Sequence, residues 1–152
     1  MSDNCMIVVP VIPEFIPAPK LVQRAKKVVQ EIAPEADEIS LIEGEQIRLF
    51  DCGSNLLSVS CPKCSSPIEF DWWSSAMSSD YHDAYGFQLK SLNVPCCGAN
   101  VTLNQLRYDS NQAFGKFALR AMNPGIEALS DEETGNIESA LGCKVSVVYQ
   151  HL

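Results

Sequence analysis

Four of the seven cysteines in this chain stand in two close pairs, and this pattern constrains the fold more than any other feature. The first pair lies in the motif C-P-K-C at 61–64, and the second in P-C-C-G at 95–98. Thiolates at such short spacing are the ligands that Zn²⁺ takes in closed tetrahedral sites. A shared ion would require two turns far apart in the sequence to meet in space. We expect one zinc site formed by Cys61, Cys64, Cys96 and Cys97.

The second pair departs from the usual spacing of a zinc knuckle. An ordinary knuckle would carry a cysteine at position 94, where this chain has Val94. Two ligand sets are open: the adjacent Cys96 and Cys97 both bind, or Cys97 binds while His82 supplies the fourth ligand. Gly98 suits the positive φ that such turns often require. Four thiolates would close the coordination shell, so we expect a structural zinc, although an iron–sulfur cluster accepts the same donors.

Composition places the chain among ordinary globular proteins. Apolar residues make up 46% of its 152 residues and charged residues 20%, which excludes disordered and collagen-like classes. No stretch reaches the ~20 apolar residues of a membrane helix, and the apolar run 6–13 contains two prolines with no basic stretch before it. An odd number of cysteines without a secretion signal argues against a disulfide framework. We therefore expect a cytoplasmic protein that does not enter membranes.

The first part of the chain, residues 1–54, shows the pattern of strand, helix and strand. Its apolar run 6–12 predicts a buried strand, and residues 20–33 place apolar side chains along one helical face. Residues 39–51 alternate in polarity and predict a strand, or a hairpin broken at Gly44.

The last part, residues 109–152, repeats this order. Alternation predicts a strand over 117–122, and a second strand begins at 143. Between them, Ser130 and Glu133 have the spacing of a helix capping box. Two strand–helix–strand units commonly combine into one antiparallel sheet with both helices on one face. We therefore expect an α+β fold with a ferredoxin-like arrangement.

Residues 55–108 contain both cysteine pairs, and we interpret them as a zinc-ribbon-like subdomain inserted into a discontinuous sheet domain of residues 1–54 and 109–152. A helix is predicted over 71–82, in the span between the two turns. Short strands are predicted around three pairs of apolar residues: Leu57 and Val59, Phe87 and Leu89, Val101 and Leu103.

No catalytic pattern stands out, and we expect a protein that is not an enzyme. The chain has no G-x-G-x-x-G, P-loop or G-x-S-x-G motif. Nineteen acidic and eleven basic residues give a net charge of −8, which favours a basic protein as partner and disfavours phosphate backbones. Nucleic-acid binding through the ribbon is the alternative, and Lys63, Lys90 and Arg107 offer few phosphate contacts there. The sequence predicts no oligomeric state.

A redox function of the C-x-x-C motif is a further alternative. Reactive dithiols of this type normally stand at a helix N-terminus that lowers the thiol pKa. Here Cys61 and Cys64 are followed by Ser65, Ser66 and Pro67, which do not begin a helix. Cysteines can also be plain buried apolar residues, but proline and glycine in the turn positions favour metal binding.

The ordered motifs resemble a known family. They are C-P-x-C at 61–64, W-W at 72–73, P-C-C-G at 95–98, L-N-x-L-x-Y at 103–108 and L-G-C at 141–143. From about residue 6 to the end, they are similar to those of small, largely uncharacterised bacterial proteins with a C-P-x-C and P-C-C-G metal centre. The resemblance implies the same four zinc ligands and a bacterial cytoplasm. A small acidic bacterial protein of this kind would suit the neutralisation of a basic toxin, as immunity proteins do.

Overall fold

A six-stranded sheet forms one part of the structure, a computed structural model that describes residues 3–152. Its strand order is β11-β1-β10-β2-β6-β5. The long strands are β1 (Asn4–Pro10), β2 (Glu38–Phe50), β10 (Ala113–Met122) and β11 (Val145–His151), and neighbours among them pair antiparallel. Every residue of β1 after Asn4 is buried. The apolar run therefore forms an inner strand, as the sequence predicts.

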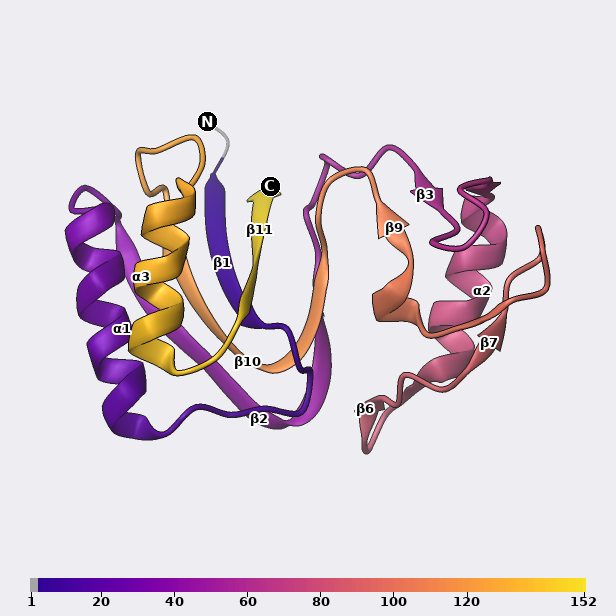
Figure 1. The fold of residues 1–152 in the computed structure, drawn as a ribbon, viewed down its shortest axis with the longest axis horizontal. Helices are drawn as coiled ribbons and strands as arrows, with labels where there is room; N and C mark the ends of the chain where they lie inside the picture. Colours follow the sequence, from indigo (N-terminus) through magenta and orange to yellow (C-terminus); the bar gives the residue numbers. More distant parts are fainter. Residues whose placement is uncertain (1–2) are drawn as a thin grey trace.

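Two helices pack side by side on one face of this sheet (Figure 1). Helix α1 (Pro19–Ile32) follows β1, and helix α3 (Asp131–Leu141) precedes β11. Their apolar side chains form one buried cluster with alternate strand residues such as Met6, Val8 and Phe117. Each end of the chain is thus a strand–helix–strand unit, and the fold is α+β.

The limits of α3 follow from its sequence. The N–H of Glu133 donates to Ser130 Oγ at 3.1 Å, and the N–H of Ser130 donates to the Glu133 carboxylate at 2.9 Å. This is the predicted capping box. Gly142 ends the helix with a φ of 77°, which glycine adopts without steric strain.

Strand β2 is one continuous element, so of the two interpretations of residues 39–51 the strand is confirmed and the hairpin is wrong. Residues 38–43 pair with β10 and residues 48–50 pair with it again, which leaves 44–47 as a bulge opposite Lys116. Within the bulge, Ile47 pairs in parallel with Gly86. The bulge turns this segment toward two short strands, β6 (Gly86–Phe87) and β5 (Tyr81–His82), which complete the sheet.

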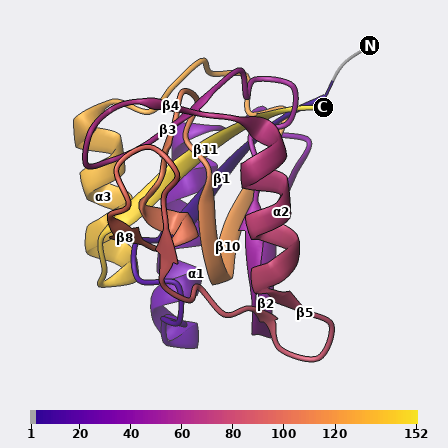
Figure 2. The ribbon, with the colours of Figure 1, turned by 90° about the vertical axis from the view of Figure 1, so that its right-hand side faces the viewer.

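Apart from β5 and β6, the chain between β2 and β10 forms the other part of the structure, and Figure 2 shows the molecule from that side. Helix α2 occupies Phe70–Asp80, so the helix predicted over 71–82 is confirmed with limits one residue earlier at its start and two residues earlier at its end. The remaining elements are short: strands β3 (Val59–Ser60), β4 (Pro67–Ile68), β7 (Leu92–Asn93), β8 (Asn100–Val101) and β9 (Arg107–Tyr108), and the 3₁₀ helix η1 (Leu103–Gln105). Strand β3 pairs with both β4 and β9, and β7 pairs with β8.

This part has an apolar cluster that continues into the main sheet. Val59, Val101 and Leu103 belong to the cluster, and so do Ile47 of β2 and Phe114 of β10. The two parts therefore share side-chain packing. The division at residues 55 and 108 stays a prediction.

The three short strands predicted in this part form, but each includes only one residue of its predicted pair. Leu57 is 76% exposed and precedes β3, and Leu103 belongs to η1 rather than to a strand. Leu89 has a φ of 52° and lies outside β6. Its N–H donates to the carboxylate of Asp80, as do the N–H groups of both neighbours, at 2.8–2.9 Å. The buried carboxylate thus bends this segment into a loop.

Candidate metal centre

Two turns in this part have the same backbone hydrogen bonds. In the first, the N–H of Ser65 donates to the carbonyl oxygen of Cys61 at 3.0 Å. In the second, the N–H of Gly98 donates to the carbonyl oxygen of Val94 at 2.9 Å. A further bond, from the first residue's N–H to the carbonyl five residues later, closes each turn at 2.9 and 3.1 Å. The two turns are therefore one motif used twice.

Because the hydrogen bonds are the same, each position of the first turn has a counterpart in the second. Val94 matches Cys61, and Cys97 matches Cys64, so the second turn lacks a sulfur at its first position. Cys96 instead matches Lys63, one residue before the end of the turn. The fourth sulfur thus comes from a position that an ordinary knuckle does not use.

The residue after each turn has left-handed backbone angles. Gly98 has a φ of 71°, as predicted, and its counterpart Ser65 has a φ of 63°. A residue with a Cβ is strained there, whereas glycine is not. The Ser65 hydroxyl accepts a hydrogen bond from Arg107 Nη1 at 3.2 Å, which ties the first turn to β9.

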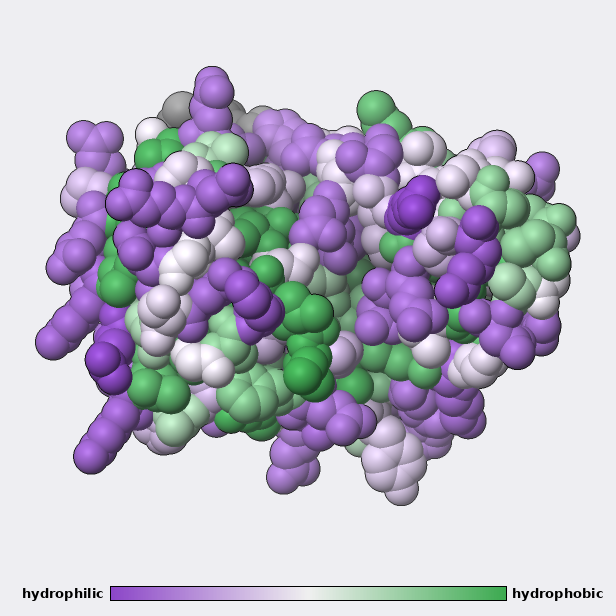
Figure 3. All heavy atoms as spheres, in the orientation of Figure 1, coloured by the Kyte–Doolittle hydropathy of each residue, from purple (hydrophilic) through white to green (hydrophobic). Residues whose placement is uncertain are grey.

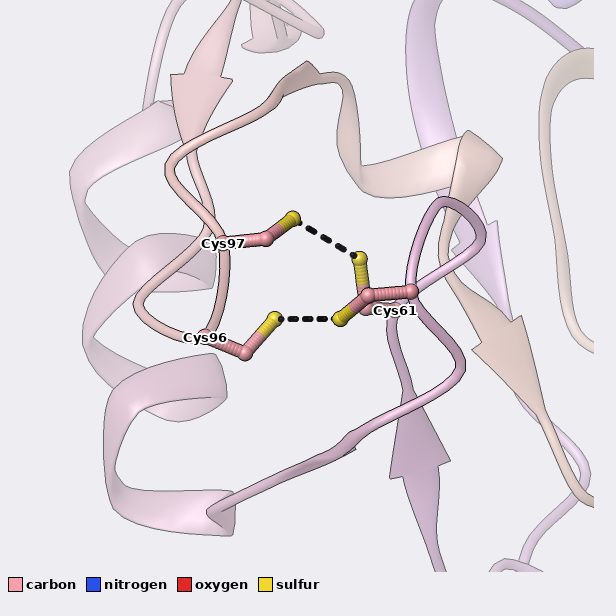
Figure 4. Close-up of side chains that lie close together, drawn as sticks. Cys61, Cys96 and Cys97 are labelled. Carbon is pink, nitrogen blue, oxygen red and sulfur yellow. Dashed lines mark hydrogen bonds between the residues drawn. The ribbon is translucent and has the colours of Figure 1, made fainter.

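The sulfur atoms of the two turns converge. All four, from Cys61, Cys64, Cys96 and Cys97, lie within 4.8 Å of one another. Cys61 Sγ lies 3.9 Å from Cys97 Sγ, and Cys64 Sγ lies 3.3 Å from Cys96 Sγ. Figure 4 shows the side chains of Cys96 and Cys97 pointing from one loop toward Cys61 on the other.

These spacings suit a metal ion better than a covalent bond. Four sulfurs around Zn²⁺ at a Zn–S distance near 2.3 Å stand about 3.8 Å apart. A disulfide would bring two sulfurs to about 2.0 Å, and all four cysteines are free thiols. The group could therefore hold one metal ion.

His82, the alternative fourth ligand, does not belong to this group of donors. Its Nδ1 accepts the N–H of Ala84 at 3.0 Å, and its ring stacks on Tyr85 with the centroids 4.7 Å apart. The adjacent Cys96 and Cys97 are both close to the first turn. The structure thus favours the set of four cysteines.

The surrounding groups give the thiols unequal proton affinities. Hydrogen bonds from the side chain and the N–H of Ser66 lower the pKa of Cys64 to about 6. The N–H of Cys64 likewise lowers the pKa of Cys61. Loss of hydration, together with the neighbouring sulfurs, raises the pKa of Cys96 to about 12. A cation among them would remove this repulsion and favour the thiolate in all four.

Three of the four cysteines are accessible to solvent. Cys61 is fully buried, whereas Cys64, Cys96 and Cys97 are exposed. The N–H of Lys63 donates to Cys61 Sγ at 3.3 Å, which fixes the buried sulfur. An ion could reach the exposed sulfurs without any rearrangement of the core.

Behind the turns, one hydrogen-bonded chain connects three elements. Trp73 Nε1 of α2 donates to the Tyr108 hydroxyl of β9 at 3.2 Å, and this hydroxyl donates to the carbonyl of Leu103 at 2.8 Å. Burial raises the pKa of Tyr108 to about 12. Trp72 and Trp73 are both half-buried against the shared apolar cluster.

The other three cysteines lie away from the centre. Cys5 and Cys52 are buried, and Cys143 is half-buried. Burial raises the pKa of each thiol. They serve as small apolar residues, as expected of cysteines outside the two pairs.

Comparison of the chain with models of protein families, with curated proteins and with solved structures gave no match. Within residues 3–152, none of the helices combines the length and the apolar character that a membrane crossing requires.

Proposed function

We propose that Cys61, Cys64, Cys96 and Cys97 bind one structural Zn²⁺ and that the protein is a non-enzymatic protein-interaction module. The convergence of four sulfurs from two copies of one turn carries this proposal. Four protein ligands would leave no open position for a substrate, which is the hallmark of structural zinc. All-thiolate tetrahedral donors suit zinc and iron–sulfur centres, and zinc is the simpler occupant of a single-ion site.

The ion would supply folding energy where the chain has little regular structure of its own. The strands that carry the two turns are only two residues long. Metal binding joins the β3–β4 turn to the β7–β8 turn and is linked to the folding of this part. We further assign a zinc-ribbon-like character to residues 55–108 and a ferredoxin-like arrangement to the sheet part, because its long strands follow the order β11-β1-β10-β2.

Elemental analysis of the purified protein tests the metal. We expect one zinc per chain, with loss of zinc in Cys64→Ser and in Cys96→Ser. Cys143→Ser is the matched control, because Cys143 lies outside the group and should leave the zinc content unchanged. Iron with visible charge-transfer absorption, or no bound metal, would contradict the proposal.

The interaction role rests on charge and on the family resemblance. A net charge of −8 favours a basic protein partner, and the resemblance to small bacterial proteins supports a cytoplasmic role such as neutralising a basic toxin. Affinity purification from the native cells should recover a stoichiometric basic partner that dissociates as salt is added. A chain that purifies without any stoichiometric partner would contradict this role.

One observation favours a second candidate, thiol redox chemistry. Cys64 is exposed and its pKa is lowered to about 6, as in reactive thiols. Its partner Cys61 is fully buried, however, and the next helix begins only at Phe70. Iodoacetamide should label Cys64 quickly after zinc removal and slowly in the zinc-bound protein. Equal rates in both states would favour redox chemistry.

A further inference from the structure

Two sulfurs of the candidate metal centre are exposed and in contact across the two turns. Cys64 of the first turn and Cys96 of the second are both exposed, and their Sγ atoms lie 3.3 Å apart. Cys97 is exposed as well, but its Sγ lies 3.9 Å from that of Cys61, which is fully buried. Of these two contacts between the turns, the one between Cys64 and Cys96 is therefore the shorter and the more accessible to a reagent in water.

The irregular position of the fourth sulfur creates this contact. In a regular second turn the sulfur would be at position 94, where the side chain is only 2% exposed. Cys96 instead matches Lys63, which is exposed in the first turn. The shift from 94 to 96 thus moves a sulfur from the interior to the surface. A structural ion needs no accessible ligand, so the position of Cys96 suits a reaction at the site in addition to metal binding.

The contact lies where the chain can move a little. The second turn follows β7 at the right-hand end of the molecule in Figure 1, and Figure 3 shows this end, in the same orientation, as outer surface on which green apolar residues lie beside purple hydrophilic ones. To form a disulfide, the two sulfurs would approach from 3.3 Å to about 2.0 Å. This is a small displacement for two turns that are carried by strands of only two residues.

We propose that Cys64 is a site of oxidation by hydrogen peroxide and that it forms a disulfide with Cys96, which displaces the zinc. The proposal adds regulation to the zinc site proposed above and rests on that site. It differs from a redox function of the C-P-K-C motif, in which Cys64 would pair with Cys61 within one turn. The disulfide would instead join the two turns, so that they stay connected after the ion has left.

The reaction balances with one molecule of peroxide as the oxidant. The Cys64 thiolate attacks one peroxide oxygen, so that an S–O bond forms, the O–O bond breaks and hydroxide leaves. The Cys96 thiolate then attacks the Cys64 sulfur, so that the S–S bond forms, the S–O bond breaks and a second hydroxide leaves. The two sulfurs lose two electrons, which the peroxide takes up, and each hydroxide takes a proton from the buffer. Only Cys61 and Cys97 then remain as ligands, which is fewer than zinc sites in proteins have.

Titration of the zinc-loaded full chain with hydrogen peroxide tests the proposal. A chromophoric chelator reports the zinc released, and mass spectrometry locates the disulfide after the remaining thiols are alkylated. Trypsin separates the cysteines of the centre into three peptides, 49–63, 64–90 and 91–107. We expect one zinc released per peroxide consumed and a disulfide between the second and third peptides, which fragmentation assigns to Cys96. Dithiothreitol with added zinc should restore the original zinc content.

Two variants separate this reaction from zinc binding. Val94→Cys combined with Cys96→Ser keeps four cysteines, and at the same peroxide concentration it should release zinc at least about tenfold more slowly, because Cys64 then lacks its contact across the turns. Cys143→Ser should react at the unaltered rate, since Cys143 lies outside the group. If the double variant holds no zinc, the position of the disulfide in the unaltered chain decides alone.

Two results would overturn the proposal. One is zinc that stays bound in excess peroxide, and the other is a disulfide within one turn, either between peptides 49–63 and 64–90 or inside 91–107. The zinc content of the untreated chain is measured first and tests the proposed function separately. A chain that holds one zinc and then gives either result retains the zinc site and loses only its regulation, whereas a chain isolated without metal contradicts the site itself.

Discussion

Cys61 and Val94 occupy the same position in two turns with the same hydrogen bonds, yet only one of them carries a sulfur. Both side chains are buried, at 0% and 2% exposure. The missing sulfur is replaced by Cys96, which lies two residues later in the second turn. The centre therefore combines three sulfurs at regular knuckle positions with one at an irregular position.

This relationship predicts that the fourth ligand can be moved. Cys96→Ser should weaken zinc binding by more than about 100-fold, the upper range for loss of a mere outer-shell partner. Adding Val94→Cys should restore much of the affinity, because residue 94 matches Cys61 and the two side chains are similar in size. Competition with a chromophoric chelator measures both variants. If the double variant binds zinc no more tightly than Cys96→Ser, a cysteine at position 94 does not place its sulfur where the ion binds.

Ser65 and Gly98 both have left-handed backbone angles, which favour glycine. Removing the glycine at 98 and introducing one at 65 should therefore change the stability in opposite directions. Gly98→Ala should destabilise the zinc-bound protein by about 1–2 kcal/mol, the cost of a Cβ at these angles. An added Cβ would meet nothing within 4 Å, so the cost is conformational alone. Ser65→Gly should stabilise by a smaller amount, since it also removes the bond from Arg107. Urea denaturation of both variants measures the changes. Destabilisation by Ser65→Gly would mean that the Arg107 bond outweighs the strain.

The buried carboxylate of Asp80 predicts a large effect of its removal. It is 4% exposed and accepts three main-chain N–H groups of the loop that follows β6. Asp80→Ala should lower the free energy of unfolding by about 2–4 kcal/mol, because these donors lose a charged acceptor. Hydrogen exchange of the three amides should accelerate. The exposed neighbour Asp83 provides the control, and Asp83→Ala should change stability by less than about 0.5 kcal/mol.

Thiol protonation predicts that zinc binding depends on pH. The pKa of Cys96 is raised to about 12, so this thiol is protonated at pH 7 without metal and must release its proton to bind. The N–H of Ala99 acts to lower the pKa of Cys97, but partial loss of hydration and the sulfurs of the first turn together outweigh it and raise this pKa. Affinity should therefore rise with pH from 6 to 8 by roughly tenfold per unit for each proton released.

Calorimetry in two buffers of different ionisation enthalpy counts the protons. We expect at least two to be released per zinc at pH 7, from Cys96 and Cys97. Binding without proton release would mean that the thiols are already ionised, or that they are not the ligands.

The sequence predicted those features that depend on neighbouring residues. The apolar run of β1 and the capping box at Ser130 gave a strand and a helix within a few residues of their observed limits. The paired cysteines were enough to locate the candidate centre, because the two members of each pair are close in sequence and lie in one turn. The repeated strand–helix–strand order was enough to predict an α+β fold.

The features that sequence reasoning missed depend on contacts between distant segments. The bulge at residues 44–47 arises where Ile47 leaves β10 to pair with Gly86. No local pattern marks Asp80 as the acceptor of a loop, or Gln112 as a buried amide whose nitrogen has no partner within residues 3–152. The equivalence of Val94 and Cys61 also appears only once the hydrogen bonds of both turns are compared, since their sequences differ at the first position.

X-ray absorption at the zinc edge of the purified, metal-loaded protein tests the central claim most directly. It measures the number, kind and distance of the atoms around the ion. Binding by Cys61, Cys64, Cys96 and Cys97 predicts four sulfur neighbours at about 2.3 Å and no nitrogen or oxygen. Fewer than four sulfurs, or a shell that contains imidazole nitrogen or water oxygen, would contradict a closed structural site.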